Sequence, residues 1–310
     1  MNGMKLLATG RALPRTALSN DDMRRYVETS DEWITTRTGI RQRYFCAEDE
    51  TAATLAIEAS RLALERSALA PEDIGCVVVA TSSGDYAMPS VASMVHAALG
   101  LPRHIPALDV GAACAGFLYA METARGLLLC AQKRYALVVG SEKMSALMDM
   151  SDRATCVLFG DGAGAAVFAL EAAAEYVSVH GTRGDMAIRA GGIGHLPMQM
   201  DGQAVFRFAV STISSCVQEL VRAGGVTLED VDWFVCHQAN ERILDASVRR
   251  LGVPAEKFYK NLDHYANTGA ASIPIALDEM REKGLLTAGQ RAIWVGFGGG
   301  LTWAGVMLRV

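Results

Sequence analysis

The sequence is short of the features that mark membrane, extracellular and metal-binding proteins. Its 310 residues contain no run of about 18 apolar residues, which is the length that a membrane-spanning helix needs. The apolar part of its first residues is too short for a signal peptide. The 7 cysteines are scattered, and they form neither a CxxC pair nor a cluster with histidine at metal-ligand spacing. We therefore expect a reduced, cytoplasmic protein without a membrane span or a structural metal.

An excess of positive charge is also missing. Charged residues make up 20% of the chain and the formal net charge is -5, so the chain lacks the basic character of a nucleic-acid-binding protein. An acidic partner would need a local basic patch to bind. Apolar residues, in contrast, reach 51%, which is enough for a large core. The length allows one large domain or two moderate ones.

One cysteine stands at a distinctive place in the predicted structure. Residues 105–110 form a short extended run, and apolar residues recur at helical spacing from Phe117 onward, so Cys114 lies where a strand turns into a helix. The first amides of a helix lack internal partners and carry the positive end of its dipole. Such a position lowers the pKa of a thiol and makes it a better nucleophile. The alternative is a buried structural cysteine.

Helical spacing and apolar runs predict the main elements. We expect helices over residues 51–67, 91–99 and 209–223 and strands over residues 74–81 and 135–140. A further short helix follows Ser30, a good N-cap, and carries Trp33 and Arg37. The run from Ile74 to Thr81 is apolar throughout, which is typical of a strand buried on both faces. We therefore predict an α/β fold with helices on both faces of its sheets.

The order of these elements repeats along the chain. The segment 72–81 has a counterpart in 229–238, and each follows an amphipathic helix. A corner of small residues comes next in both cases, at 111–116 and 267–272, followed by an apolar strand and a glycine-rich turn. We therefore predict a duplicated α/β unit whose halves are residues 1–170 and 171–310.

The repeat places three chemically active residues at equivalent corners. Cys114 lies at the corner of the first half, His237 at a strand end of the second half, and Asn267 at its corner. A lone histidine at a strand end is more often structural. If the halves pack about a pseudo-twofold axis, however, the three residues meet, and such a group favours nucleophilic catalysis.

Several motifs together resemble one family, and they cover nearly the whole chain. They are Thr29-Ser-Asp-Glu-Trp-Ile, Asp109-Val-Gly-Ala-Ala-Cys-Ala-Gly-Phe, His237-Gln-Ala-Asn-x-Arg-Ile, Asn267-Thr-Gly-Ala-Ala-Ser-Ile-Pro and Phe297-Gly-Gly-Gly-Leu-Thr-Trp. The chain resembles β-ketoacyl-acyl-carrier-protein synthase III, the condensing enzyme that starts bacterial fatty acid synthesis. The resemblance implies a thiolase-like fold in a five-layered αβαβα arrangement, a homodimer, and no cofactor beyond the coenzyme A thioester that serves as substrate.

The same resemblance implies roles for individual residues. Cys114 resembles the acyl-accepting nucleophile, His237 and Asn267 the pair that drives malonyl decarboxylation, and the amides of Cys114 and Gly299 the oxyanion hole. Residues that hold coenzyme A are matched by Thr29, Trp33, Arg37, Arg153 and Asn240. Residues that dock the acidic acyl carrier protein are matched by Gln238, Ala239, Asn240, Glu241, Arg242, Arg207, Arg249 and Arg250.

Other functions stay open at this point. A relative in secondary metabolism would have the same triad but a different acceptor. A Cys-His-Asn thiol hydrolase and a catalytically silent binding protein are further alternatives. Met88 stands where the family often has Phe, in a loop that reaches the acyl pocket of the neighbouring subunit in relatives, so the preferred primer is left open.

Overall fold

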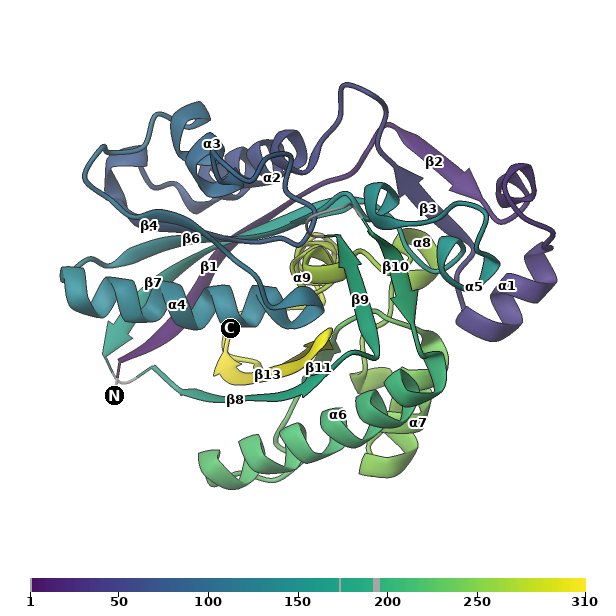
Figure 1. The fold of residues 1–310 in the computed structure, drawn as a ribbon. Coiled ribbons are helices and arrows are strands. Elements are labelled where there is room, and N and C mark those ends of the chain that lie inside the picture. The colour runs from purple at the N-terminus through teal and green to yellow at the C-terminus, as the bar shows by residue number, and fades with distance from the viewer. Residues whose placement is uncertain (1, 173, 192–195) are drawn as a thin grey trace.

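Two β-sheets form the centre of the protein. The structure, a computed structural model, describes residues 2–172, 174–191 and 196–310 (Figure 1). The first sheet has the order β1-β7-β6-β4-β5, and the second has the order β11-β12-β13-β8. The first contains β1 (Asn2–Ala12), β4 (Ile74–Ala80), β5 (Ala107–Val110), β6 (Tyr135–Glu142) and β7 (Gly162–Ala172). The second contains β8 (Tyr176–Asp185), β11 (Trp233–Cys236), β12 (Arg291–Gly298) and β13 (Gly300–Arg309).

The two sheets share one pattern of strand directions. In the first sheet, β6 runs parallel to β4, and β7 runs antiparallel to both β6 and β1. In the second sheet, β12 runs parallel to β11, and β13 runs antiparallel to both β12 and β8. The edges differ, because β5 pairs with β4 whereas a single bridge joins Phe234 of β11 to Phe258. A duplicated α/β unit predicts such matching sheets.

Helices cover both faces of each sheet. α2 (Ala52–Ser67) and α3 (Val91–Ala98) pack on the outer face of the first sheet, and α6 (Gly202–Gly224) and α7 (Glu241–Leu251) pack together on the outer side of the second. α4 (Gly116–Ala131) and α9 (Ser272–Glu282) lie between the sheets, where their apolar side chains form one cluster with both (Figure 1). The layers therefore follow the expected αβαβα order.

The predicted elements with the strongest local signals are found in place. All 7 residues of β4 are buried, as its continuous apolar run predicted. The Thr51 hydroxyl accepts a hydrogen bond from the backbone N–H of Thr54, and the Thr51 N–H donates to the Thr54 hydroxyl. This capping box fixes the start of α2 next to the predicted residue.

α6 is longer than predicted. It begins at Gly202 rather than at Ala209, after Asp201 caps its first turn. Phe206 is 37% exposed although it is apolar, and this residue obscures the amphipathic pattern of the first turns. Among the described residues, α6 is also the one helix long and apolar enough to cross a membrane by length and composition. Half of its most apolar 18-residue stretch is buried inside the protein. The core helix of a globular protein can have the same length and composition.

Two small two-stranded sheets were not predicted. β2 (Thr16–Ser19) pairs with β3 (Gln42–Phe45) beside α1 (Asp31–Thr38) (Figure 1). β9 (Ile188–Gly191), which follows β8 in the chain, pairs with β10 (Leu196–Met200), which precedes α6. Two single-turn helices, α5 (Arg153–Cys156) and α8 (Leu262–Tyr265), complete the α-helices among the described residues. Of these short segments, β9, β10 and α5 contribute residues to the wall of the cavity that contains Cys114.

Candidate active site

Two glycines allow the corners of one half to pack against the strands of the other. A Cβ on Gly140 of β6 would lie 2.3 Å from the carbonyl oxygen of Ala270, in the turn before α9. A Cβ on Gly296 of β12 would lie 2.9 Å from the Cα of Ala115, in the turn before α4. Any larger side chain would collide with the backbone at both places. The two corners therefore meet at the centre of the molecule.

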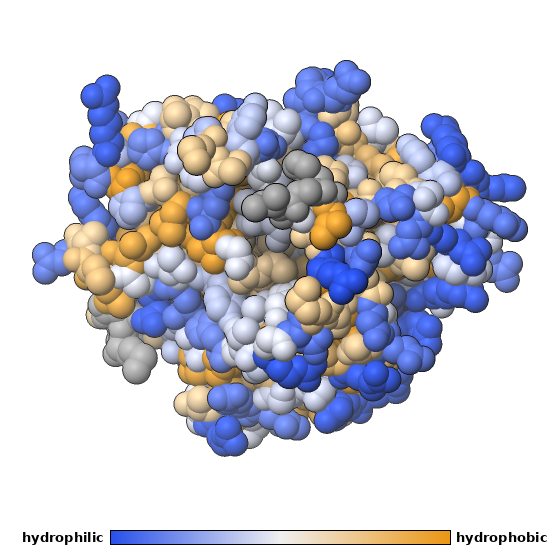
Figure 2. Space-filling view, viewed as in Figure 1, coloured by the Kyte–Doolittle hydropathy of each residue, from blue (hydrophilic) through white to orange (hydrophobic). Residues whose placement is uncertain are grey.

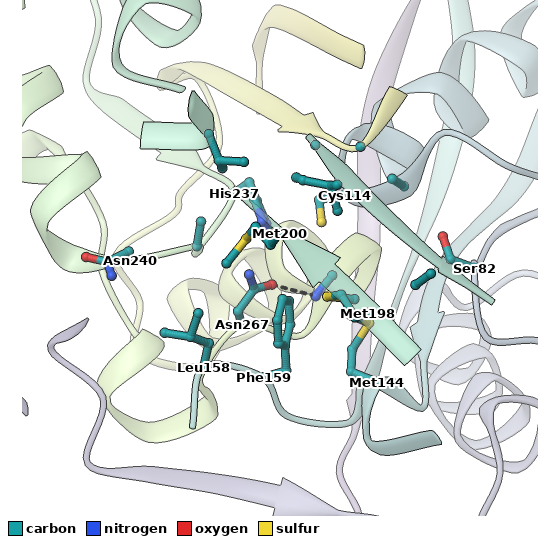
Figure 3. Close-up of a pocket in the computed structure, with 18 of the residues that line it drawn as sticks. Ser82, Cys114, Met144, Leu158, Phe159, Met198, Met200, His237, Asn240 and Asn267 are labelled. Carbon is teal, nitrogen blue, oxygen red and sulfur yellow. Dashed lines mark hydrogen bonds between the residues drawn. The ribbon is translucent and has the colours of Figure 1, made fainter. Parts of the chain in front are cut away.

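Cys114, His237 and Asn267 line one cavity of about 480 Å³. Cys114 lies in the turn Ala113–Ala115 before α4, His237 follows β11, and Asn267 precedes the turn Gly269–Ala271 that leads into α9. Figure 3 shows these side chains around the same space, each from a different element. The structure therefore brings the three predicted residues together.

Burial decides the ionisation of the Cys114 thiol. It raises the pKa of Cys114 to about 12, and the nearby Glu142 carboxylate also raises it, whereas a backbone hydrogen bond lowers it by less. The expectation that the helix end gives Cys114 a low pKa is therefore wrong for the free protein, because desolvation of the thiolate is the largest influence on that pKa. The thiol is protonated at neutral pH.

A glycine turn after β12 lies directly against Cys114. A Cβ on Gly298 would lie 2.8 Å from the backbone nitrogen of Cys114. The Thr302 hydroxyl contacts the carbonyl oxygens of Ala112 and Gly299, at 3.1 Å and 3.0 Å, and so ties this turn to the cysteine corner. Gly299 also lines the cavity. The amides of Cys114 and Gly299 thus come from adjacent segments, an arrangement that suits a two-donor oxyanion hole.

His237 is buried and held on several sides. Its backbone N–H donates to the Val295 carbonyl oxygen at 2.8 Å, and its ring packs edge-on against Phe297 with the ring centroids 5.1 Å apart. Its Nδ1 lies 2.7 Å from the hydroxyl oxygen of Ser272. Burial lowers the pKa of His237 to about 3, because the charged imidazolium is poorly solvated there. The ring is therefore neutral near pH 7 and carries one N–H.

Asn267 is fixed by both its backbone and its side chain. Its backbone N–H donates to the Leu158 carbonyl oxygen, and its carbonyl oxygen accepts from the Gly160 N–H, each at 3.0 Å. Its Oδ1 accepts from the Gly269 N–H at 3.0 Å, the dashed line in Figure 3. Among the described residues, the Nδ2 of Asn267 and the Nε2 of His237 have no hydrogen-bond partner. Both nitrogens are therefore available to a molecule in the cavity.

A buried carboxyl group that the sequence analysis missed lines the same cavity. Glu142, at the end of β6, accepts hydrogen bonds from the Ser82 N–H at 3.1 Å and the Ser83 hydroxyl at 2.5 Å, and from the Ala270 amide. Burial raises the pKa of Glu142 to about 7, and these hydrogen bonds oppose the rise. Glu142 thus joins the first sheet to the turn that follows Asn267. Nothing in the local sequence marks a glutamate at a strand end as buried.

The remaining wall of the cavity is mainly apolar. It is formed by Met144, Leu147, Leu158, Phe159, Ile188, Met198, Met200, Val205, Phe206 and Ile243, among others. Met198 and Met200 belong to β10, so the β9–β10 hairpin forms one side of the cavity (Figure 3). This wall could not be predicted from the sequence, because apolar residues on short loops and strands carry no chemical motif.

Two guanidinium groups stack on the indole of Trp33. The Cζ of Arg37 lies 4.5 Å from the ring centroid, and the Cζ of Arg153 lies 4.7 Å from it. Ser30 caps α1 as predicted, because its hydroxyl accepts from the Trp33 N–H at 3.1 Å. Hydrophilic residues gather over this end of the molecule, where α1 and the β2–β3 sheet lie (Figure 2). The structure therefore places Arg153 at the same indole ring that Arg37 contacts on α1.

Asn240 connects this end of the molecule to the cavity. It caps α7 by accepting from the Arg242 N–H at 2.9 Å, its Nδ2 donates to the Arg37 carbonyl oxygen at 3.1 Å, and it lines the cavity. The Oγ1 of Thr29 is buried without a hydrogen-bond partner among the described residues. Both residues were predicted to lie along the coenzyme A path, and their placement is compatible with that role.

The residues matched to carrier-protein docking fall into two groups. Arg207, Arg242, Arg249 and Arg250 are exposed, and none of them forms an ion pair with another described residue. Gln238, in contrast, is buried, and its side chain donates to the carbonyl oxygens of Cys236 and Tyr259. This position removes the Gln238 side chain from any docking surface.

Ala239 and Glu241 also contact other parts of the protein, and the Glu241 side chain is 44% exposed. The Glu241 carboxylate lies 3.2 Å from the Nζ of Lys260, and its side chain packs so closely on Gly39 that a Cβ there would lie 2.6 Å away. Ala239 lines the cavity. Within the matched segment 238–242, Arg242 is therefore the free cation on the surface.

Met88 lies far out on the surface of its own chain. Its side chain is 83% exposed, and the nearby Tyr86 is 64% exposed. Neither residue lines the cavity that holds Cys114. Two large apolar side chains in an exposed loop are typical of a contact with another molecule.

The described residues hold neither a disulfide nor a metal cluster. The 7 cysteines are all free thiols. No group of three or more His, Cys, Asp or Glu side chains within residues 2–172, 174–191 and 196–310 is arranged to hold a metal ion.

Two family models match the chain. The model described as 3-oxoacyl-[acyl-carrier-protein] synthase III matches residues 108–182, and the model of its C-terminal region matches residues 221–310. The β-ketoacyl-[acyl-carrier-protein] synthase III of Sphingopyxis alaskensis is 46% identical, over 98% of this chain and 98% of its own length.

Solved structures agree with this match. The 3-oxoacyl-[acyl-carrier-protein] synthase III from Aquifex aeolicus VF5 has a TM-score of 0.94 at 38% identity, and the alignment covers 99% of this chain and 100% of that one. The priming β-ketosynthase of the R1128 polyketide pathway has a TM-score of 0.94 at 34% identity, over 99% of this chain and 96% of its own. The expected thiolase-like fold is thereby confirmed. The chain belongs to the β-ketoacyl-[acyl-carrier-protein] synthase III family, the acyltransferases that initiate fatty acid synthesis by condensation.

Proposed function

We propose that the chain condenses a short acyl-CoA primer, such as acetyl-CoA, with malonyl-acyl-carrier protein through an acyl thioester on Cys114. The observation that carries this proposal is the cavity that Cys114, His237 and Asn267 line together. Exchange of a thioester and loss of CO2 need a nucleophile and hydrogen-bond donors. Coenzyme A therefore enters as a substrate thioester, and the chemistry asks for no metal or redox cofactor.

In the first step, the sulfur of Cys114 attacks the thioester carbonyl of the primer. The oxygen of that carbonyl becomes an oxyanion, which the amides of Cys114 and Gly299 stabilise by hydrogen bonds. The bond between the carbonyl carbon and the sulfur of coenzyme A then breaks. The proton that Cys114 loses ends on the coenzyme A thiol, so the step balances without an external acid. Because the Cys114 pKa is raised, proton loss belongs to the activation barrier of this step.

In the second step, the malonyl group loses CO2 and leaves an enolate, whose oxygen needs donors rather than a base. The Nε2 of a neutral His237 and the Nδ2 of Asn267 supply these donors, since the Nδ1 and Oδ1 atoms already have partners. The enolate carbon attacks the acyl carbonyl on Cys114, and the cysteine thiolate leaves. The thiolate takes up one proton, and 3-oxoacyl-carrier protein is released.

The nucleotide end of coenzyme A is held at the Trp33 site in this proposal. The indole offers a flat face for the adenine, and Arg37 and Arg153 offer positive charge for the phosphates. The contacts of both guanidinium groups with the same ring support this assignment. Thr29 and Asn240 then line the path between this site and Cys114.

The acidic carrier protein docks on the exposed arginines near the cavity. Arg242 follows Asn240 at the cavity, and Arg249 lies seven positions later in α7, so the two share one face of that helix. Arg207 on α6 lies beside Val205 and Phe206, which line the cavity, and Arg250 follows Arg249. These cations, which form no ion pair with another described residue, supply the local basic patch that an acidic partner needs on a chain of net charge -5.

The oligomeric state, the location and the domain boundary of the chain are also part of the proposal. We expect a homodimer that works in the cytoplasm and binds neither nucleic acid nor a membrane. The boundary between the halves is proposed near residue 170, and the gap between β7, which ends at Ala172, and β8, which begins at Tyr176, supports it.

A second function is kept because of one similarity. The priming β-ketosynthase of the R1128 polyketide pathway, at 34% identity, supports a condensing enzyme of secondary metabolism with another acceptor. Turnover with malonyl-carrier protein and with malonyl-CoA, measured side by side, separates the two functions. A strong preference for malonyl-carrier protein from fatty acid synthesis favours the first.

Mass spectrometry of the intact protein and its peptides tests the nucleophile. After incubation with a panel of acyl-CoAs, the acyl group should map to Cys114 and disappear in Cys114→Ala. Cys130 is exposed, so it serves as the internal control for nonspecific labelling. Acyl groups on Cys130 or Cys46 instead, or on no cysteine, would remove Cys114 from its role.

A further inference from the structure

Ser272 forms a hydrogen bond with Nδ1 of His237. In the proposed reaction the other ring nitrogen, Nε2, faces the substrate. The Ser272 hydroxyl oxygen lies 2.7 Å from Nδ1 of His237, and both residues are buried, at 3% and 1% exposure. Ser272 is the first residue of α9 and follows the turn that carries the Asn267 corner. The contact therefore joins His237 to the segment that leads from Asn267 into α9.

The direction of this hydrogen bond follows from the other partner of the hydroxyl. The backbone N–H of Gln238 points at the same Ser272 oxygen, at 3.4 Å, and an amide N–H can only donate. If Nδ1 of His237 carried a proton, the serine oxygen would accept two hydrogen bonds, one from Nδ1 and one from the Gln238 N–H. Its own proton would then have no acceptor among the described residues. An unpaired buried donor is costly, so the arrangement with the serine donating to Nδ1 is favoured.

We propose that Ser272 is a positioning residue that holds neutral His237 in the tautomer with its proton on Nε2. The inference rests on the proposed function and deepens it, because Nε2 is the nitrogen that can donate to the malonyl thioester oxygen. A ring held in this tautomer cannot take the proton of Cys114 through Nε2. Ser272 thus supports the condensation step and leaves the first acyl transfer independent of His237 as a base.

Nitrogen NMR of the wild-type protein tests the tautomer directly. The chain contains 6 histidines, so a protein labelled with ¹⁵N-histidine gives few ring signals, and a His237→Gln variant assigns those of His237. We expect an unprotonated Nδ1 and a protonated Nε2 near pH 7. A protonated Nδ1 would overturn the proposal. If such a protein still forms acyl-Cys114 and the 3-oxoacyl product, the proposed function stands while this inference fails.

Substitution of Ser272 tests the role in the reaction. Hydrogen-bond partners that orient a metal-bound histidine are typically worth about 10- to 100-fold in activity, and by analogy we expect a loss of about this size in condensation by Ser272→Ala. Acylation of Cys114 by acyl-CoA should stay near the wild-type rate, and Ser272→Thr, which keeps the hydroxyl, should recover most of the condensation rate. Equal loss in both half-reactions, or no loss in condensation, would contradict the positioning role.

A matched control separates this role from general loss of a buried serine. Ser214 on α6 is 2% exposed and its hydroxyl donates to the Val210 carbonyl oxygen at 2.9 Å, inside the helix. Ser214→Ala should leave both half-reactions and the His237 ring signals unchanged. If Ser272→Ala fails to fold, the NMR measurement on the wild-type protein still decides the tautomer.

Discussion

At the scale of single residues, Asn267 offers the clearest separation of the two half-reactions. Its Oδ1 is occupied by the Gly269 N–H, so Nδ2 is the group that can act on the malonyl thioester. We predict that Asn267→Ala still forms acyl-Cys114 but makes little product, since loss of one such donor typically costs about 10²- to 10³-fold in rate. Acylation is timed by mass spectrometry, and CO2 release is followed from labelled malonyl-carrier protein.

Asn267→Asp provides the matched control for this prediction. The aspartate keeps the shape of the side chain and the oxygen that accepts from Gly269, but it lacks the N–H donor and is acidic. Both variants should therefore acylate normally and decarboxylate slowly. Release of CO2 at the wild-type rate by either variant would show that Asn267 does not act on the enolate.

The raised pKa of Glu142 predicts that the stability of the protein depends on pH. Its pKa is raised by burial from 4.5 to about 7 in the folded protein, so its contribution to stability is fully present below the unfolded pKa. The contribution is lost as the pH rises through 7, because the folded protein then holds a poorly solvated carboxylate. Glu142→Gln cannot ionise. The free energy of unfolding of Glu142→Gln minus that of the wild type should therefore increase by up to a few kcal/mol between about pH 5 and pH 8.

Urea unfolding at several pH values measures this difference. Glu171→Gln is the control, because the Glu171 side chain is 31% exposed and pairs with Lys5 and Arg134 at the surface. The control should show a nearly constant difference from wild type over the same range. A constant difference for Glu142→Gln as well would mean that the buried carboxyl does not titrate as its surroundings indicate.

The residues that sequence reasoning found and missed differ in a physical way. Cys114, His237 and Asn267 could be predicted because each stands in a motif of small or polar residues whose types suit one chemistry. Ser272 and Glu142 could not, because their importance comes from partners distant in the chain: His237 is 35 residues from Ser272, and Ser83 is 59 residues from Glu142. The raised pKa of Cys114 was missed for the same reason, since burial depends on the packing of both halves.

At the scale of elements, α1 is proposed to bind the nucleotide end of coenzyme A. We predict that Arg37→Ala raises KM for acyl-CoA while kcat changes less, because a contact with the remote end of the substrate stabilises bound substrate and transition state alike. Trp33→Ala should behave in the same way. Steady-state kinetics over a range of acyl-CoA concentrations gives both constants.

The control for this prediction is another arginine of a helix surface. Arg61 on α2 pairs with Glu58, and its side chain is 44% exposed. Arg61→Ala should leave KM for acyl-CoA unchanged. An unchanged KM in Arg37→Ala and Trp33→Ala would reduce α1 to a structural element.

α7 is proposed to carry the docking surface for the carrier protein. Arg242→Ala should slow condensation with malonyl-carrier protein, by roughly 5- to 30-fold if one docking charge contributes about 1–2 kcal/mol, and should leave acylation by acyl-CoA intact. Added salt should slow the wild-type condensation, because exposed charges are screened beyond about 10 Å at 0.1 M ionic strength. Rates of both half-reactions at two salt concentrations test this.

Arg222 provides the comparison for Arg242. It is exposed in the last turn of α6, far along that helix from Val205 and Phe206 at the cavity. Arg222→Ala should change neither half-reaction. Equal loss of both half-reactions in Arg242→Ala would indicate damage to the fold instead of lost docking.

The elements themselves were predictable where local signals and tertiary packing agree. β4 and α2 were found close to their observed ends, because an apolar run and a capping box mark them directly. The β9–β10 hairpin was missed, since its strands have only 4 and 5 residues and show no clear alternation. This hairpin forms one side of the cavity, and the acyl pocket was therefore the part of the site that the sequence described least.

At the scale of the whole molecule, the sheet edge and the Met88 loop point to a second copy of the chain. β5 is the edge strand of the first sheet and all 4 of its residues are only partly buried. Hydrophobic residues gather on the side of the molecule where α4 and β4 are seen (Figure 2). An exposed strand edge invites pairing with another chain. A dimer formed at this edge would cover the loop that carries Tyr86 and Met88.

In such a dimer Met88 would complete the acyl pocket of the partner, and its flexible side chain would accept more than one primer shape. We predict that Met88→Phe changes the ratio of kcat/KM between acetyl-CoA and longer or branched primers. One methylene in such a pocket is worth about 1–3 kcal/mol, or about 10- to 200-fold. Competition between primers for acylation measures the ratio. An unchanged ratio would place the limit on primer size elsewhere in the cavity.

A mixed dimer decides whether Met88 acts on its own chain or on the partner. One subunit carries Met88→Phe with an intact Cys114, and the other carries Cys114→Ala with an intact Met88, so that only the first subunit can be acylated. If the loop crosses the interface, this single working site contains a methionine and shows the wild-type primer ratio. If the loop serves its own subunit, the site shows the ratio of the Met88→Phe homodimer. The exposure of Met88 and its distance from its own cavity make the wild-type ratio the expected result.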